Sequence, residues 1–148
     1  MTTYTNPSVR SDHALTLTGA ESLLEEGLRI ARSRGLELCL AIVDPAGFLL
    51  AFRRMDGAPL VSIEVAISKA RTAAYLKNPS RAFEEMIDAG KPSMLSTPGI
   101  VPLRGGVPVG LGDALVGAVG VSGATGEVDD EVAEQIAASL VSEQARDA

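Results

Sequence analysis

Basic side chains gather in the middle of this acidic sequence, next to residues that can turn the chain sharply. Arg53 and Arg54 close an apolar segment, and the next predicted helix carries Lys69. Another cation, Arg104, precedes two glycines. Arginine can bind a carboxylate or phosphate through two parallel hydrogen bonds, so this basic corner is a candidate site for an anion. The alternative is a solvated strand end where acidic neighbours such as Asp56 pair with the cations.

Few other residues can do acid–base or metal chemistry. The sequence has one histidine, His13, and one cysteine, Cys39. A His-rich metal site and an ordinary Ser-His or Cys-His catalytic pair are therefore excluded. Any proton transfer falls to Lys69, Asp56, Glu64 or the arginines, and Lys69 and Asp56 are the candidate catalytic residues. His13 is either an ordinary residue or an axial haem ligand borrowed across a subunit interface.

Two glycine-containing segments are further candidates for ligand binding. Segment 103–113 contains Gly105 and Gly106, but it matches neither the dinucleotide fingerprint nor a P-loop, and no helix follows it. Segment 121–130 leads from a predicted strand through Ser122 and Gly123 to a helix start, where backbone N–H groups can bind an anion. Three acidic residues already occupy the positive end of that helix dipole and oppose this interpretation. They are Glu127, Asp129 and Asp130.

Composition limits the classes of protein. The chain has 148 residues, the usual size of one domain, and 46% of them are hydrophobic, enough to form a core. A net charge of -6 argues against nucleic-acid binding, which needs a basic surface. The polar start has no signal-peptide core, and no apolar run is long enough to span a membrane. We therefore expect a cytoplasmic protein with no nucleic-acid or membrane partner.

Periodicity predicts the elements that would position these residues. Strand patterns alternate with helical patterns, and the first two strands are joined by the turn sequence DPAG. Because the strands come in hairpins, we predict an α+β fold with about five mainly antiparallel strands. A polar arm (1–14) precedes one domain (15–142), and a polar tail (143–148) follows it. Predicted helices cover 15–35, 58–76, 78–90 and 124–141, and predicted strands lie in 36–43, 48–55 and, as a group of three, 100–123.

Single residues add detail to this pattern. Thr18 is the predicted cap of the first helix. The small-residue face of helix 58–76 can pack tightly on a sheet or on a copy of itself. Pro108 fits an edge strand, and Gly117 and Gly120 inside the last strand predict a close approach of another backbone.

Five motifs in a fixed order resemble the GlcG/HbpS-like family of small haem-associated proteins, which is related to the PduO C-terminal domain. They are IVDPAG (42–47), RRMDGA (53–58), SIEVAISKARTAA (62–74), RGGVPV (104–109) and VGAVGVSGATGEVDDEVA (116–133). The resemblance implies a profilin-like fold with a five-stranded antiparallel sheet. It also implies assembly into a tetramer or octamer and an association with haem.

The resemblance further implies a pocket between the second and third motifs on one side and the last two motifs on the other. We predict that the protein binds haem or a small anionic ligand there. The alternative is a cofactor-independent lyase, hydratase or isomerase in which Arg54 and Arg104 grip a small carboxylic acid. A third possibility is an accessory protein without a ligand. The predicted ligand-binding residues are Arg53, Arg54, Ser62, Arg104, Gly105, Gly106, Ser122 and Gly123.

Overall fold

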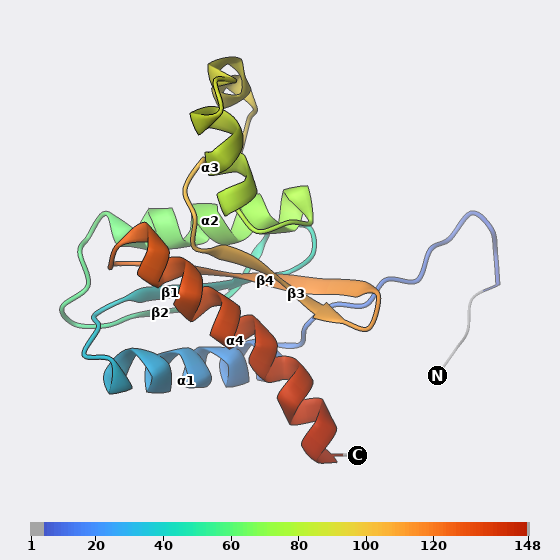
Figure 1. The fold of residues 1–148 in the computed structure, drawn as a ribbon. Coiled ribbons are helices and arrows are strands. Elements are labelled where there is room, and N and C mark those ends of the chain that lie inside the picture. The colour runs from blue at the N-terminus through green and yellow to red at the C-terminus, as the bar shows by residue number, and fades with distance from the viewer. Residues whose placement is uncertain (1–4, 148) are drawn as a thin grey trace.

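The computed structural model describes residues 5–147, with side chains described up to residue 140. This part of the chain forms four α-helices, one 3-10 helix and one four-stranded antiparallel sheet in the order β2-β1-β4-β3 (Figure 1). The α-helices are α1 (Leu17–Ser33), α2 (Ser62–Leu76), α3 (Arg81–Asp88) and α4 (Gly126–Asp147), and the 3-10 helix is η1 (Pro92–Ser96). The strands are β1 (Cys39–Val43), β2 (Leu49–Arg54), β3 (Gly106–Leu111) and β4 (Ala114–Ser122).

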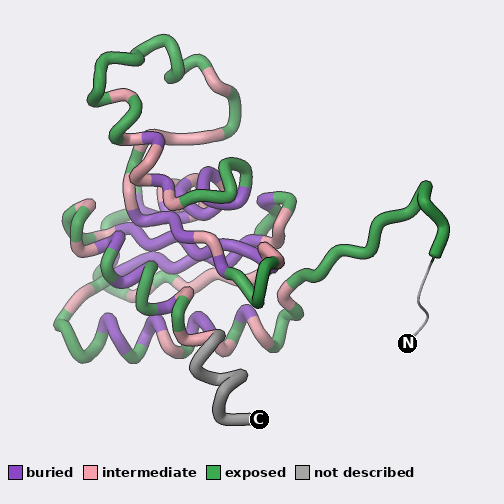
Figure 2. The backbone as a smooth tube through the Cα atoms, turned by 45° about the vertical axis from the view of Figure 1, so that its right-hand side comes forward, coloured by how far each residue is buried: buried purple, intermediate pink, exposed green. Residues whose placement is uncertain are grey.

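The sheet separates two layers of helices. α1 and α4 cover one face, α2 covers the other, and α3 with η1 projects beyond α2 (Figure 1). Figure 2 shows the buried residues concentrated in the sheet and the helices against it, whereas the α3–η1 projection and the N-terminal arm are mostly exposed. No described helix is both long and apolar enough to cross a bilayer.

Side chains alternate along the strands and give the two faces different characters. Leu40 and Ile42 of β1 join the large aliphatic cluster with α1 and α4. Cys39 and Ala41 join a cluster of mainly alanines with α2. Successive strand residues point to opposite faces, so one short strand contributes to both cores. The small-residue face of α2, predicted from its sequence to pack tightly on a sheet, does so.

Close packing of α2 on the sheet depends on glycine. A Cβ atom added at Gly120 of β4 would lie 1.9 Å from the carbonyl oxygen of Ala66. A Cβ atom added at Gly117 would also clash with a backbone atom, here the carbonyl oxygen of Val43 in β1. The sequence predicted close approach at both glycines, and this is confirmed.

The predicted turn between the first two strands is also confirmed. The N–H of Gly47 donates to the carbonyl of Asp44, and Gly47 has a φ of 88°. The Asp44 carboxylate accepts hydrogen bonds from the N–H groups of Ala46 and Phe48. Aspartate and glycine therefore have the roles for which turns select them.

The prediction of five strands is wrong, because segment 100–104 does not join the sheet. The N–H of Val101 donates to the Thr72 hydroxyl of α2, and the carbonyl of Leu103 accepts from the Ser80 hydroxyl. Side chains thus take the backbone groups that a strand would use in a ladder, and Pro102 has no N–H to donate. Pro108 does lie in an edge strand, β3, as predicted.

Several element boundaries also differ from the prediction. α1 is capped by Thr16, whose hydroxyl accepts from the N–H of Gly19 at 3.0 Å, rather than by Thr18. α2 begins at Ser62 after a turn rather than at Pro59. The predicted loop 91–99 contains η1, and α4 continues through most of the predicted tail to Asp147.

Candidate functional site

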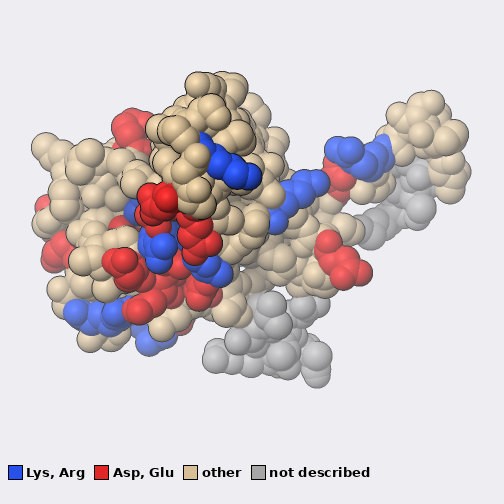
Figure 3. All heavy atoms as spheres, turned by 45° about the horizontal axis from the view of Figure 1, so that its top comes forward, with Lys and Arg blue, Asp and Glu red and all other residues tan. Residues whose placement is uncertain are grey.

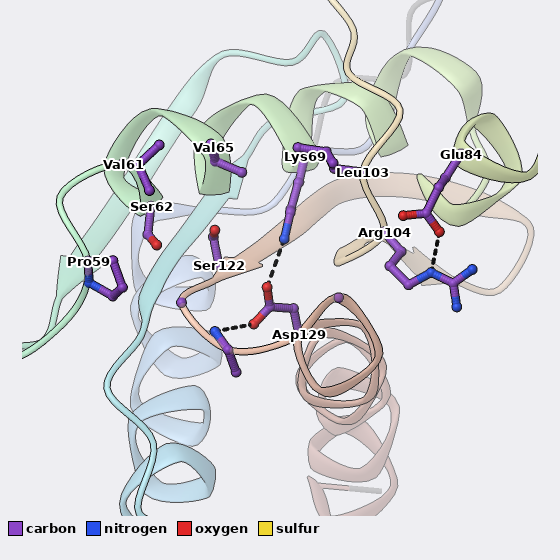
Figure 4. A pocket seen from close by; sticks show the side chains of 13 residues that line it. Pro59, Val61, Ser62, Val65, Lys69, Glu84, Leu103, Arg104, Ser122 and Asp129 are labelled. Atoms are coloured by element: carbon purple, nitrogen blue, oxygen red, sulfur yellow. Dashed lines mark hydrogen bonds and ion pairs between the residues drawn. The ribbon is translucent and has the colours of Figure 1, made fainter. Parts of the chain in front are cut away.

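A cavity of about 320 Å³ lies where the first half of α2 meets the end of β4 and the start of α4 (Figure 4). Its volume is at the small end of the range for ligand-binding pockets. Its lining combines apolar residues with polar and charged ones, and both kinds occur on the α2 side. The lining residues are Pro59, Val61, Ser62, Val65, Lys69, Glu84, Leu103, Arg104, Ser122, Gly123, Ala124, Gly126 and Asp129.

Helical spacing places three cavity residues of α2 in one row. Ser62, Val65 and Lys69 are separated by three and four residues, so their side chains share one face of the helix. Figure 4 shows the Lys69 side chain extending from this row toward the start of α4. The sequence therefore delivers a hydroxyl, a methyl pair and an amine to the same wall.

Lys69 and Asp129 form a buried ion pair at the inner end of the cavity. Their side chains are only 5% and 3% exposed, and Nζ lies 2.9 Å from Oδ2. Nζ also donates to the carbonyl oxygen of Val121 at 3.0 Å. The second carboxylate oxygen, Oδ1, accepts from the N–H of Ala124 at 2.9 Å. Both charges are thus oriented by backbone groups, which fixes the amine relative to the cavity.

Two consecutive glycines at the start of β3 allow the chain to approach Lys69 closely. Gly105 has a φ of 119°, and a Cβ atom there would lie 3.0 Å from Nζ of Lys69. A Cβ atom at Gly106 would lie 2.0 Å from the carbonyl oxygen of Lys69. Gly105 and Gly106, predicted to bind a ligand, instead pack against Lys69 and are not among the lining residues.

Two serine hydroxyls face the cavity beside the amine. Ser62 on α2 and Ser122 at the end of β4 are 2% and 6% exposed, and their side chains point into the space between the two elements (Figure 4). No hydrogen bond of either hydroxyl is found within the described part of the chain. Two of the three N–H donors of Lys69 form hydrogen bonds with Val121 and Asp129. The lining of the cavity therefore includes three hydrogen-bond donors that could bind an oxygen atom of a ligand.

Arg104 lines the cavity but its charge is already paired. Its Nε forms a hydrogen bond and ion pair with the carboxylate of Glu84, and Figure 4 shows the guanidinium directed toward α3, away from Lys69. This hydrogen bond is the main cause that raises the pKa of Arg104. Figure 3 shows acidic and basic side chains mixed on one face rather than separated into a basic surface. Arg104 is therefore expected to bind an anion more weakly than an unpaired arginine would.

The rest of the basic corner lies outside the cavity. Arg53, Arg54 and Asp56 are not among the lining residues. Arg53 donates to the carbonyl of Phe52, and Arg54 and Asp56 are exposed. Of the predicted site residues, the structure therefore brings together Ser62, Lys69, Arg104, Ser122 and Gly123.

The sequence analysis did not predict Asp129 as a site residue and assigned it to the positive end of the helix dipole. The position of Lys69 in its helix could have indicated that an acidic partner is needed. This lysine lies in the same stripe of α2 as Ala66, Ala70 and Ala73, which all pack against the sheet. A lysine in a buried stripe needs an acidic partner. Among the described residues, no group of three His, Cys, Asp or Glu side chains is placed to hold a metal ion.

Comparison with known proteins agrees with this architecture. The model of the family described as "Haem degrading protein HbpS-like" matches residues 15–138. Protein GlcG of Escherichia coli K12 is 36% identical over 103 residues, which cover 70% of this chain and 77% of GlcG.

Two solved structures are similar over most of the chain. HbpS of Streptomyces reticuli, solved as a double mutant, matches with a TM-score of 0.85 and 30% identity, covering 95% of this chain and 96% of that one. A structure described as a PduOC:Heme complex matches with a TM-score of 0.76 and 28% identity, covering 84% and 94%. By sequence and by fold, this chain belongs to the HbpS-like family.

Proposed function

We propose that this protein binds a small organic acid in the cavity between α2, β4 and α4. The observation that carries the proposal is that the Lys69 ammonium and the hydroxyls of Ser62 and Ser122 line one cavity. A carboxylate has two oxygens that can accept several hydrogen bonds. The valines and Leu103 would contact its short aliphatic part.

The ion pairs around the cavity predict a modest affinity for this acid. Lys69 is paired with Asp129 and Arg104 with Glu84, so the cations that line the cavity are already neutralised. Recognition then depends mainly on hydrogen bonds, each of which contributes about 1 kcal/mol. We expect dissociation constants nearer the millimolar than the nanomolar range.

Matched ligands test whether an acid is preferred. Thermal unfolding is followed with propionate and with propionamide, which have similar shapes and differ in charge. Propionate should raise the melting temperature more than propionamide does. Ser62→Ala and Ser122→Ala should each weaken propionate binding about fivefold, and Ser68→Ala, on the same helix outside the cavity lining, is the matched control. Equal shifts with both ligands, or none with propionate, would contradict the proposal.

Asp129→Asn tests the role of charge separately. The amide oxygen can still accept from the N–H of Ala124, but Lys69 loses its counter-charge. Propionate would then supply that charge. Its stabilising effect should therefore be larger in this variant than in the wild type, whereas that of propionamide should not.

The alternative of a cofactor-independent enzyme acting on a small carboxylic acid would use the same cavity. Asp56 and Arg54 lie outside its lining, so Lys69, with Asp129, is the acid–base group in place. Turnover of an acid would then depend on Lys69 rather than on Asp56.

Haem binding is a second candidate, supported by the family model and by the similarity to a PduOC:Heme complex. The cavity itself does not fit haem. Its 13 lining residues include none of the His, Tyr, Cys or Met side chains that ligate haem iron. His13 lies exposed in the N-terminal arm, which extends away from the body of the protein (Figure 1).

A hemin titration separates the two candidates. If haem binds through the arm, a saturable Soret band should appear with the wild type and be lost with His13→Ala. Lys69→Arg should leave that band unchanged, because Lys69 lies in the cavity. The absence of any saturable band would contradict the haem candidate and leave the small-acid proposal standing.

We also propose that the chain assembles into a homo-oligomer, with a tetramer or octamer as the expected size. The support is the α3–η1 projection (81–96), which stands away from the body of the protein (Figure 1). Several apolar side chains are exposed there. These are Met86, Met94 and Leu95.

A further inference from the structure

The chemistry of the buried amine goes beyond hydrogen bonding. Lys69 is a buried primary amine at the wall of an open cavity, with a carboxylate oxygen 2.9 Å from its nitrogen. Buried lysines are the residues that form Schiff bases with carbonyl substrates. We propose that Lys69 forms a reversible Schiff base with a small 2-oxo acid bound in the cavity. The proposal rests on the proposed function, because it names the class of acid.

Asp129 is placed to move the protons that this step requires. The ammonium first gives a proton to Oδ2 of Asp129, with which it already shares a hydrogen bond. The free amine attacks the carbonyl carbon, and the C–N bond forms as the carbonyl π bond breaks. Asp129 then returns its proton to the oxygen, which gives a carbinolamine. It next takes a second proton from the nitrogen and passes it to the same oxygen, which leaves as water while the nitrogen lone pair forms the C=N bond. Overall, an ammonium and a ketone become an iminium and one water molecule, so neither charge nor redox state changes.

The constant charge explains why the buried ion pair suits this reaction. The iminium keeps the positive charge of the ammonium, so Asp129 keeps a cationic partner throughout. Its carboxylate is held in place by the N–H of Ala124, and Gly105 lies against the amine, where an added Cβ atom would be 3.0 Å from Nζ. A charge that stays paired avoids the large cost of a lone buried charge.

The serine hydroxyls decide which carbonyl compound fits. Ser62 and Ser122 line the same cavity as the amine, so they can donate to a carboxylate whose neighbouring carbon carries the carbonyl (Figure 4). In a 2-oxo acid the two groups are adjacent, which matches a cavity of about 320 Å³ better than a long molecule does. The methyl end of a molecule such as pyruvate would contact Val65 or Leu103.

Reductive trapping tests the proposal. The protein is incubated with pyruvate and cyanoborohydride, and the modified residues are mapped by peptide mass spectrometry. The sequence has two other lysines, Lys77 and Lys91, both exposed, which serve as internal controls. We expect modification of Lys69 to exceed that of either control by at least about tenfold, a small part of the gain that positioning can give. Equal or lower modification of Lys69 would overturn the proposal.

Variants and a second ligand separate this proposal from simple binding. Lys69→Arg should abolish the specific adduct, and the matched substitution Lys77→Arg should leave it intact. Ser122→Ala should lower the yield at a fixed pyruvate concentration. If pyruvate raises the melting temperature as propionate does but no adduct forms at Lys69, the Schiff base is refuted and acid binding stands. If neither ligand binds and no adduct forms, both proposals fail.

Discussion

At the scale of single residues, Cys39 shows how burial controls reactivity. It lies in β1 with no exposed surface, and burial raises the pKa of its thiol, although Arg54 opposes the change. Because the folded state holds the thiol proton more tightly than the unfolded chain does, this group's contribution to stability is lost as pH rises above its ordinary pKa.

Cys39 should therefore react slowly in the native protein, since the thiolate is the nucleophile. Labelling with a disulfide reagent is measured near the ordinary thiol pKa of about 8.5. It should be much slower in the folded protein than in urea. Complete labelling of the folded protein at the rate of the unfolded chain would show that the thiol is accessible.

Replacing one partner of the Lys69–Asp129 pair should lower the free energy of unfolding much more than replacing both partners. Lys69→Met leaves the Asp129 carboxylate buried without its partner and should lower the free energy of unfolding by about 3–5 kcal/mol. The double variant Lys69→Met/Asp129→Asn should recover most of the loss, because no buried charge remains. Urea unfolding measures the free energy of unfolding of the single and the double variant.

An exposed pair provides the comparison. Arg29→Met, which breaks the ion pair with Glu26 on α1, should change stability far less, since such pairs are screened by water. If the double variant is no more stable than Lys69→Met, the pair is a net contributor to stability. In that case stability alone would account for the pair, without a role in Schiff-base formation.

At the scale of elements, contact between α2 and the sheet controls the cavity, because Lys69 and Ser62 both come from this helix. Gly120→Ala would place a Cβ atom 1.9 Å from the carbonyl oxygen of Ala66 and 2.7 Å from the nitrogen of Ala70. Both contacts are backbone atoms, so the helix must shift. We expect a loss of about 3 kcal/mol in the free energy of unfolding, together with weaker propionate binding.

Gly110→Ala is the matched substitution in the same sheet. Its Cβ atom would meet nothing closer than 3.5 Å, at the carbonyl oxygen of Ala114. Urea denaturation of both variants checks the expectation. A Gly120→Ala protein as stable as Gly110→Ala would mean that α2 does not press on β4 as described.

At the scale of the whole molecule, self-association should depend on the α3–η1 projection. Met94 and Leu95 are 37% and 54% exposed there, and aspartate at both positions should lower the mass measured by light scattering in solution. Leu111→Asp is the control, since Leu111 is also 37% exposed but lies at the tip of the β3–β4 hairpin. An unchanged mass in the double variant would place any interface elsewhere.

Local patterns in the sequence determined the elements and the close packing. Periodicity predicted α1, α2 and α4 and the first hairpin, since the turn residues of DPAG act on their own neighbours. The alanine stripe of α2 predicted a tight contact, because small side chains allow close approach whatever the partner is. The family resemblance, carried by several motifs in order, is confirmed.

Only the tertiary structure decided which groups meet. Lys69 and Asp129 are 60 residues apart, and their contact depends on how α2 and α4 pack on the sheet. Segment 100–104 has strand-like residues but gives its backbone hydrogen bonds to Thr72 and Ser80, so the sheet has four strands. Arg53 and Arg54 are close to the site in the sequence, yet β1 lies between β2 and β4, and neither arginine lines the cavity. Long-range partners compete for the same polar groups, and that competition is resolved by packing rather than by local preference.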